Sequence, residues 1–144
     1  MCARLLICIV MIALCAINQS DAVLTMEQIQ KTAMTLRNTC ISKSHADAEA
    51  VEGMQTGQFP EGNQPLKCYT LCVMKAMRTW KGGRIDDGMM IKQLDLMMPA
   101  DLAGPIKASA TACANVSPGS DDCDTTYKFV ECCYKNDKDH FFFP

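Results

Sequence analysis

Cysteine is the residue type with the most chemical potential in this chain. The 144 residues include 10 Cys, and seven of these follow position 22. Thiols in such number either pair as disulfides or ligate a metal, and the redox compartment decides between the two. An odd number leaves one thiol free or bonded to another molecule, and six paired cysteines allow about 15 connectivities. The seven are Cys40, Cys68, Cys72, Cys113, Cys123, Cys132 and Cys133.

The N-terminus predicts the secretory pathway. One basic residue, Arg4, precedes an uncharged apolar run over residues 5–17, and Ala22 closes a pattern of small residues. The run is shorter than the about 20 residues that span a bilayer. This order is typical of a cleaved signal peptide. We therefore expect a signal peptide over 1–22 and a secreted domain over 23–144, with an uncleaved anchor or a buried helix as the alternative.

Catalytic and metal-binding arrangements are missing from the sequence. The chain has no Cys-x2-Cys pair and no second Cys/His cluster that would complete a tetrahedral zinc site. It has neither His-Glu-x-x-His nor Gly-x-Ser-x-Gly around its two histidines and its serines. We therefore expect no enzyme, no metal and no cofactor. Four neighbouring carboxylates are better explained as helix caps, namely Asp86, Asp87, Asp121 and Asp122.

Charge and composition exclude further classes of protein. The chain carries 14 basic and 16 acidic residues without a block of like charges. This pattern gives no reason to expect a nucleic-acid surface or a polybasic membrane anchor. With 49% hydrophobic residues, no linker and no repeat, the chain should fold as one domain.

Six helices would position the cysteines. Apolar residues recur at spacings of three and four, a capping box opens the first helix at Thr25, and no segment shows sustained alternation. Cys68 and Cys72 fall one turn apart on one helix face. The class is therefore all-α. The expected helices cover 26–40, 44–55 with Ser44 as its cap, 66–80 ended by Gly82-Gly83, 86–97, a segment ending near 116 whose start is left open by Pro105, and 121–135.

The cysteine spacing, taken with three short motifs, resembles that of the insect odorant-binding protein family. The chain reads Cys40-x27-Cys-x3-Cys-x40-Cys-x9-Cys-x8-Cys132, and the x3 and x8 intervals are those of six-cysteine members. The motifs are Cys-Tyr-Thr-Leu-Cys (68–72), Gly-Gly-Arg-Ile-Asp (82–86) and a short aromatic tail ending in proline. The resemblance covers essentially the whole expected mature chain.

The resemblance implies a compact six-helix, disulfide-stapled domain around an apolar ligand cavity. It also implies the pairs Cys40–Cys72, Cys68–Cys123 and Cys113–Cys132. The implied function is a secreted carrier of odorants or pheromones in sensory lymph, acting as a monomer or weak dimer with an olfactory receptor as a further partner. One alternative is a carrier or scavenger outside olfaction. The other is a secreted interaction module whose core is filled.

The resemblance also implies the residues that line the cavity. From the sequence alone the methionines are ordinary core residues, but their flexible thioethers would suit ligands of varied shape. Alcohol-binding members use a serine and a threonine where this chain has Met74 and Thr79, so we expect longer, more hydrophobic ligands here. The expected ligand-binding residues are Met74, Met77, Thr79, Trp80, Met89, Met90, Leu94, Phe129, Phe141 and Phe143.

Three further features are left as hypotheses. The aromatic tail, 138–144, should fold back over the domain, since exposed phenylalanines are unfavourable in water. Protonation of His140 would then loosen this flap, or the histidine is solvated and has no such role. Cys133 is either a packed small side chain or a reactive thiol. Asn115 begins a formal glycosylation sequon.

Overall fold

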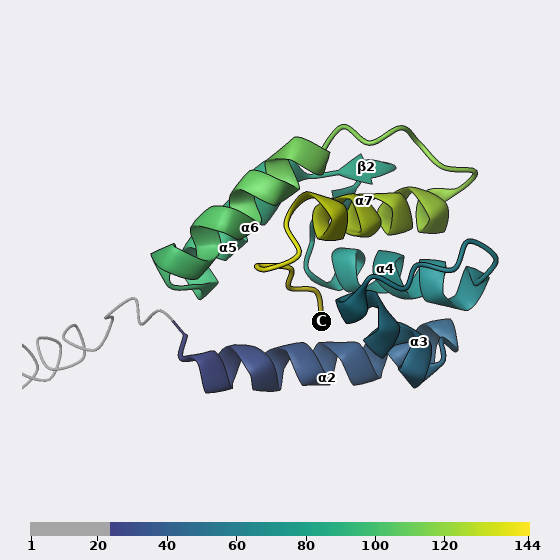
Figure 1. Ribbon diagram of the computed structural model, residues 1–144, viewed down its shortest axis with the longest axis horizontal. Helices are drawn as coiled ribbons and strands as arrows, with labels where there is room; N and C mark the ends of the chain where they lie inside the picture. The colour runs from purple at the N-terminus through teal and green to yellow at the C-terminus, as the bar shows by residue number, and fades with distance from the viewer. Residues whose placement is uncertain (1–23) are drawn as a thin grey trace, which may run out of the picture.

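The protein folds as a helical domain with one short hairpin (Figure 1). The computed structural model describes residues 24–144, and the expected signal peptide lies outside them. The all-α class with six helices is confirmed in this part of the chain. The elements are α2 (Met26–Ser44), α3 (Ala48–Gly53), the 3-10 turn η2 (Met54–Thr56), α4 (Gln64–Ala76), β1 (Trp80–Lys81), β2 (Arg84–Ile85), α5 (Asp87–Met97), α6 (Ala100–Cys113) and α7 (Asp122–Asn136).

The first two helices begin at polar caps. The capping box of α2 is present, with Gln28 N donating to Thr25 Oγ1 (3.2 Å) and Thr25 N donating to Gln28 Oε1 (2.8 Å). α2 continues to Ser44 rather than ending near Cys40, and the prediction that Ser44 caps the next helix was wrong. Ser44 Oγ instead donates to Cys40 O, and Asp47 caps α3.

The third long helix is shorter than its apolar pattern predicts. α4 ends at Ala76, not at Trp80, because Arg78 adopts φ +57° and Thr79 N turns back to Met74 O (2.9 Å). Trp80 then enters an antiparallel hairpin with β2. Gly82 and Gly83 have φ +60° and +76°, the left-handed values that a two-residue hairpin turn requires.

Two of the remaining helices, α5 and α7, begin at predicted caps. Asp86 accepts from Met89 N and Asp121 accepts from Asp124 N, each at the start of its helix. α6 begins at Ala100 and ends at Cys113 rather than near 116. Pro105 lies inside α6, where its missing N–H leaves one helical hydrogen bond unmade.

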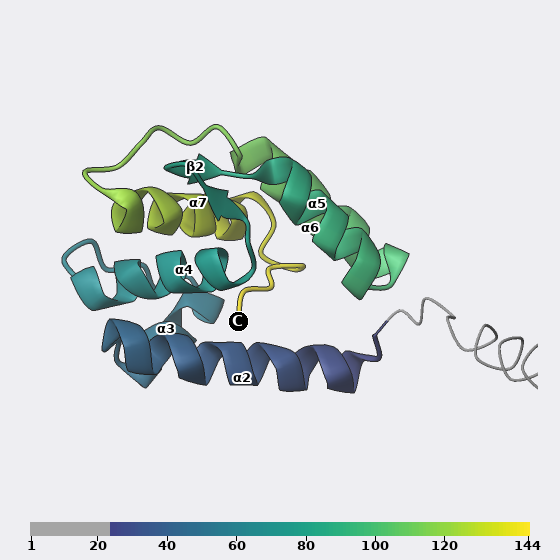
Figure 2. The ribbon, with the colours of Figure 1, turned by 180° about the vertical axis from the view of Figure 1, so that it is seen from behind.

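Three disulfides join the helices in the pairs that the family resemblance implies. Cys40–Cys72 joins α2 to α4, Cys68–Cys123 joins α4 to α7, and Cys113–Cys132 joins α6 to α7. α4 and α7 run side by side in the same direction, and Thr70 Oγ1 lies 2.9 Å from Thr126 Oγ1 one turn beyond the shared disulfide. Figures 1 and 2 show this parallel pair at the centre, with α2 along one side and α5 and α6 at the far end.

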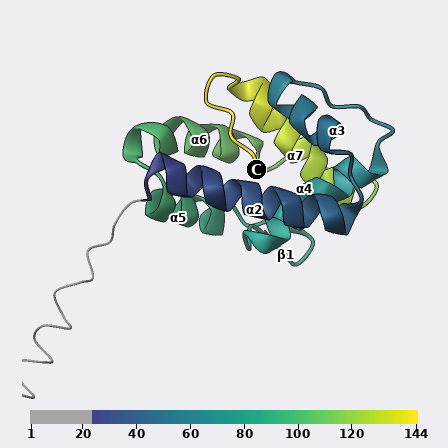
Figure 3. The ribbon, with the colours of Figure 1, turned by 90° about the horizontal axis from the view of Figure 1, so that it is seen from below.

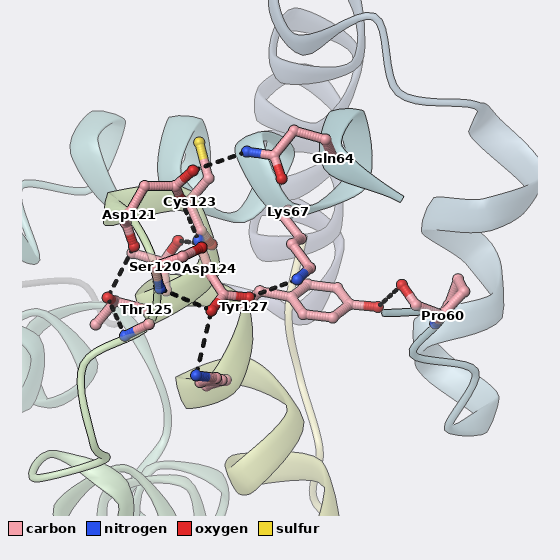
Figure 4. A network of polar contacts seen from close by, with 12 residues as sticks. Pro60, Gln64, Lys67, Ser120, Asp121, Cys123, Asp124, Thr125 and Tyr127 are labelled. Carbon is pink, nitrogen blue, oxygen red and sulfur yellow. Dashed lines mark hydrogen bonds and ion pairs between the residues drawn. The ribbon is translucent and has the colours of Figure 1, made fainter. Parts of the chain in front are cut away.

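A polar network secures the first turns of α4 and α7 (Figure 4). Lys67 Nζ lies 2.5 Å from Asp124 Oδ1, and Asp124 Oδ2 accepts from Ser120 N at 3.0 Å and faces Lys128 Nζ at 3.2 Å. The Lys67 hydrogen bond, above the other contacts, lowers the pKa of Asp124 to about 2. Tyr127 Oη donates to Pro60 O in the preceding loop (3.2 Å).

None of the described helices combines the length and apolar character of a membrane span. Within residues 24–144, no three His, Cys, Asp or Glu side chains gather as a metal site would require.

Candidate ligand-binding site

A mostly apolar cavity of about 90 Å³ lies where α4 and α7 end, between these helices, α5, α6 and the C-terminal tail. Side chains from every one of these elements contribute to its wall. The lining residues are Met74, Met77, Thr79, Met90, Leu94, Met98, Ile106, Ser109, Ala110, Phe129, Val130, Cys133, Asp137, His140, Phe141, Phe142, Phe143 and Pro144.

The structure brings eight of the ten expected residues to this cavity. They are Met74, Met77, Thr79, Met90, Leu94, Phe129, Phe141 and Phe143. Trp80 does not line it; the indole is buried in the core beside the cavity, in one cluster with Met74 and Phe129. Met89 also lies outside the wall, because neighbouring residues of a helix point about 100° apart and Met90 takes the inward direction.

Sequence reasoning missed the contribution of α6. Ile106, Ser109 and Ala110 line the cavity at the i, i+3, i+4 spacing of one helix face. The small residues of this face gave a weak apolar signal, and Pro105 obscured the helix that carries them. On α7, Cys133 lies four residues after Phe129 and three after Val130, so these three side chains extend the wall along one side of that helix.

Two buried hydroxyls, those of Thr79 and Ser109, lie in the wall. Thr79 Oγ1 donates to Met74 O (3.2 Å) and Ser109 Oγ donates to Cys133 O (3.1 Å). Each of these carbonyls also accepts a main-chain N–H, from Thr79 at 2.9 Å and from Asp137 at 3.1 Å. Either hydroxyl can therefore turn toward a ligand without leaving a buried carbonyl unpaired.

Cys133 places a thiol in the wall of the cavity. It is the free cysteine among the described residues. Burial raises the pKa of this thiol to about 12, against a smaller opposing effect of Ser109. A thiol with such a pKa stays neutral near pH 7, which favours the packed interpretation over the reactive one.

The C-terminal tail folds back into the domain, as the sequence predicts. Tyr69 Oη donates to Pro144 O, and Gln55 Nε2 donates to Phe143 O at 2.7 Å. The Phe143 ring meets the Tyr69 ring edge-on, with 6.3 Å between centroids. Figure 3 shows the end of the chain beside α2, between α6 and α7.

The tail also separates the cavity from two neighbouring hollows. One, of about 240 Å³, lies between the tail and α2 and shares Phe142, Phe143 and Pro144 with the cavity. The other, of about 180 Å³, lies between the start of α2 and α6 and shares Phe141 and Phe142. A displacement of the phenylalanines would therefore join three spaces into one.

His140 stands at the base of the tail, where its Nδ1 lies 2.9 Å from Asp137 Oδ2. A protonated ring would bind this carboxylate more strongly, because a charge-assisted hydrogen bond exceeds a neutral one. The geometry therefore gives a reason to expect that acid tightens this contact, which is the opposite sign to the loosening hypothesis.

Comparisons with known proteins agree with this architecture. The PBP/GOBP family model matches residues 22–136. General odorant-binding protein 72 of Anopheles gambiae is 30% identical over 122 residues, covering 84% of this chain and 99% of that protein. General odorant-binding protein 19a of Drosophila melanogaster is 27% identical over 144 residues and covers 97% of both.

A solved structure shows the same fold at higher identity. Odorant binding protein 5 of Apis mellifera aligns with a TM-score of 0.76 and 38% identity, covering 85% of this chain and 100% of that one. The chain therefore belongs to the PBP/GOBP family of insect odorant-binding proteins, which are carriers of small hydrophobic ligands and not enzymes.

Proposed function

We propose that this chain is secreted and carries odorants or pheromones through sensory lymph in the cavity between α4, α7 and the tail. One observation supports this most directly: the chain's own aromatic tail forms part of the wall of an apolar cavity, so a ligand bound there would be partly shielded from water. We further propose that it acts as a monomer or weak dimer and delivers its ligand to an olfactory receptor. The same scaffold used outside olfaction is the alternative, and expression in sensory or other tissues distinguishes the two.

The size of the cavity implies that the tail moves when a ligand binds. Its volume of about 90 Å³ is smaller than the roughly 150 Å³ of an engineered cavity that accepts benzene. An odorant-sized molecule therefore needs the space that the tail now occupies or the hollows that the tail separates. The flexible thioethers of Met74, Met77 and Met90 would let the wall adapt to its shape.

Met74 should favour long ligands over short ones. Its side chain is buried, 1% exposed, and extends into the cavity from the last turn of α4. A thioether offers a short alcohol almost no hydrogen bond, which forgoes about 0.5–1.5 kcal/mol. Each further buried methylene of a longer chain contributes about 0.8 kcal/mol. We therefore expect affinity to rise with ligand chain length.

Titration of the oxidised protein, residues 23–144, with N-phenyl-1-naphthylamine tests the function. Displacement of this probe by alcohols from butanol to dodecanol should strengthen with length. Met74→Ser should flatten that trend by improving the short alcohols, whereas Leu96→Ser, at a residue of α5 that is 62% exposed and lines neither the cavity nor the adjoining hollows, should leave it unchanged. If correctly disulfide-bonded protein bound neither probe nor alcohol, the carrier function would be rejected in favour of an interaction module with a filled core.

A further inference from the structure

We propose that this cavity selects neutral head groups and rejects carboxylates, so that among ligands of equal chain length it carries alcohols, aldehydes or esters rather than fatty-acid anions. The inference rests on the proposed carrier function and specifies its ligand class. Three observations support it: the direction of two helices, the charges in the cavity wall and the hydrogen bonds that the wall can offer.

The first observation is that α4 and α7 are parallel and that the C-terminal ends of both lie at the cavity. Cys68 and Cys123, in the first turns of α4 and α7, are bonded to each other. Met74 and Cys133 belong to the last turns of the same helices and both line the cavity. Figure 1 shows the two helices ending together beside the tail. Each helix C-terminus carries about half a negative charge, so two of them oppose an anion placed there.

The second observation is that no lysine or arginine of residues 24–144 lines the wall. The basic residues nearest in sequence lie elsewhere. Arg78, between Met77 and Thr79, is exposed, as is Lys75 in the last turn of α4. Lys107, beside Ile106, pairs with Asp95. Lys135 pairs with Glu131 at 2.7 Å, and Lys138 lies over the ring of Tyr134.

Among the charged and titratable groups that do line the wall, one is an acid. Asp137, Cys133 and His140 are those groups, and Asp137 lies at the end of α7 with His140 as its partner. A carboxylate ligand would therefore meet a carboxylate of the protein and no free cation.

The third observation concerns hydrogen bonds. The hydroxyls of Thr79 and Ser109 can each turn from their carbonyl to a ligand, as donor or as acceptor. One such bond satisfies the oxygen of an alcohol, an aldehyde or an ester. A carboxylate has about four acceptor positions and a full charge to desolvate, and two hydroxyls do not compensate for that.

A matched pair of ligands tests the proposal on the oxidised protein. Displacement of N-phenyl-1-naphthylamine at about pH 7.5 should be about tenfold weaker for decanoate than for 1-decanol, the size expected from opposing helix ends and an uncompensated charge. At about pH 4, where decanoic acid is largely protonated, the two should differ much less. The alcohol serves as the control for any effect of pH on the protein itself.

Two pairs of variants locate the cause. Asp137→Asn removes the negative charge in the wall and should improve decanoate about threefold relative to 1-decanol, with the affinity of each ligand compared with its own value for the wild type. Asp101→Asn removes the same charge from an exposed residue in the first turn of α6, which lines neither the cavity nor the two adjoining hollows, and should not change this ratio. Met98→Lys introduces a cation at the cavity and should strengthen decanoate binding, whereas Met98→Gln, a neutral polar change, should not.

The outcomes separate this proposal from the carrier function. Binding of the probe and 1-decanol, together with decanoate of equal affinity at neutral pH, would overturn the head-group selection and leave the carrier intact. Absence of binding by all three would overturn both. Circular dichroism and a thermal melt of each variant confirm that it is folded.

Discussion

At the scale of single residues, Asp124 is a nearly buried carboxylate that depends on its polar partners. Its carboxylate faces Lys67 and Lys128 and accepts from Ser120 N, yet its residue is 8% exposed. Removing the charge would leave Lys67, whose side chain is 15% exposed, without its partner. Loss of a charged hydrogen-bond partner lowers the free energy of unfolding more at a buried position than at the surface.

Asp124→Asn should therefore lower the free energy of unfolding by about 2 kcal/mol. Asp95→Asn breaks the pair with Lys107, in which the aspartate side chain is 52% exposed, and should change it by less than about 0.5 kcal/mol. Urea denaturation at neutral pH measures both. Equal effects of the two variants would contradict the burial argument.

The Asp124 carboxylate should also make the stability of the fold depend on pH. The folded pKa of about 2 is below the unfolded value of about 3.9, so the contribution of Asp124 is present above about pH 4 and is lost as pH falls through the folded pKa. The difference in melting temperature between wild type and Asp124→Asn should thus shrink steadily from about pH 5 to about pH 2. A constant difference over this window would show that the ionised carboxylate is not its source.

Cys133 should resist thiol reagents in the folded protein. Burial raises the pKa of its thiol to about 12, so at about pH 8 almost none is thiolate. We expect slow reaction with 5,5′-dithiobis(2-nitrobenzoate) in buffer and rapid release of one equivalent in guanidinium chloride. Cys133→Ala is the blank. Complete reaction of native protein within minutes would mean that the cavity opens widely without a ligand.

At the scale of elements, the caps of α2, α5 and α7 were predictable, whereas the cap of α3 was assigned wrongly to Ser44 and the helix ends were harder to place. Asp86 and Asp121 mark the starts of α5 and α7 because a carboxylate before an apolar pattern has one favoured role. The end of α4 could not be placed, since Met77 and Trp80 continue the 3.6-residue period after the backbone has left the helix at Arg78. The hairpin was missed because strands of two residues show no alternation.

The residues of the candidate site were likewise only partly predictable from the sequence. The methionines and phenylalanines of α4, α5, α7 and the tail follow from the family resemblance, and most of them line the cavity. The α6 wall does not follow, because Ser109 and Ala110 have small side chains that suit a close helix contact as well as a cavity. A sequence pattern tells which face of a helix is buried, but not whether another side chain or empty space lies opposite.

The tail is an element held by few bonds, and one hydroxyl should control its motion. Tyr69→Phe removes the bond to Pro144 O, so we expect faster hydrogen exchange at Phe143 and faster ligand association, with at most about 1 kcal/mol lost in stability. Tyr127→Phe removes a tyrosine hydroxyl bond to Pro60 O, which lies in the loop before α4 and not in the tail, and is the control. Equal association rates in both variants would show that this hydrogen bond does not hold the tail.

At the scale of the whole molecule, disulfides hold together a domain that keeps a hollow. Replacing Cys113 and Cys132 by alanine opens a link across 19 residues and should cost about 3 kcal/mol, whereas the same change at Cys68 and Cys123, 55 residues apart, should cost about 4 kcal/mol. Guanidinium denaturation of the two double variants measures the difference. A larger loss for the shorter link would mean that packing at the cavity, rather than loop entropy, sets the effect.

The pattern of links also has a mechanical consequence. Cys40–Cys72 joins α2 to α4, and Cys113–Cys132 joins α6 to α7. Cys68–Cys123 and the Thr70–Thr126 contact tie α4 to α7 near their first turns, at the end of the helix pair remote from the cavity. Among the described residues no disulfide joins α4 to α7 beside the cavity, so only side-chain packing holds these two helices together where a ligand would bind.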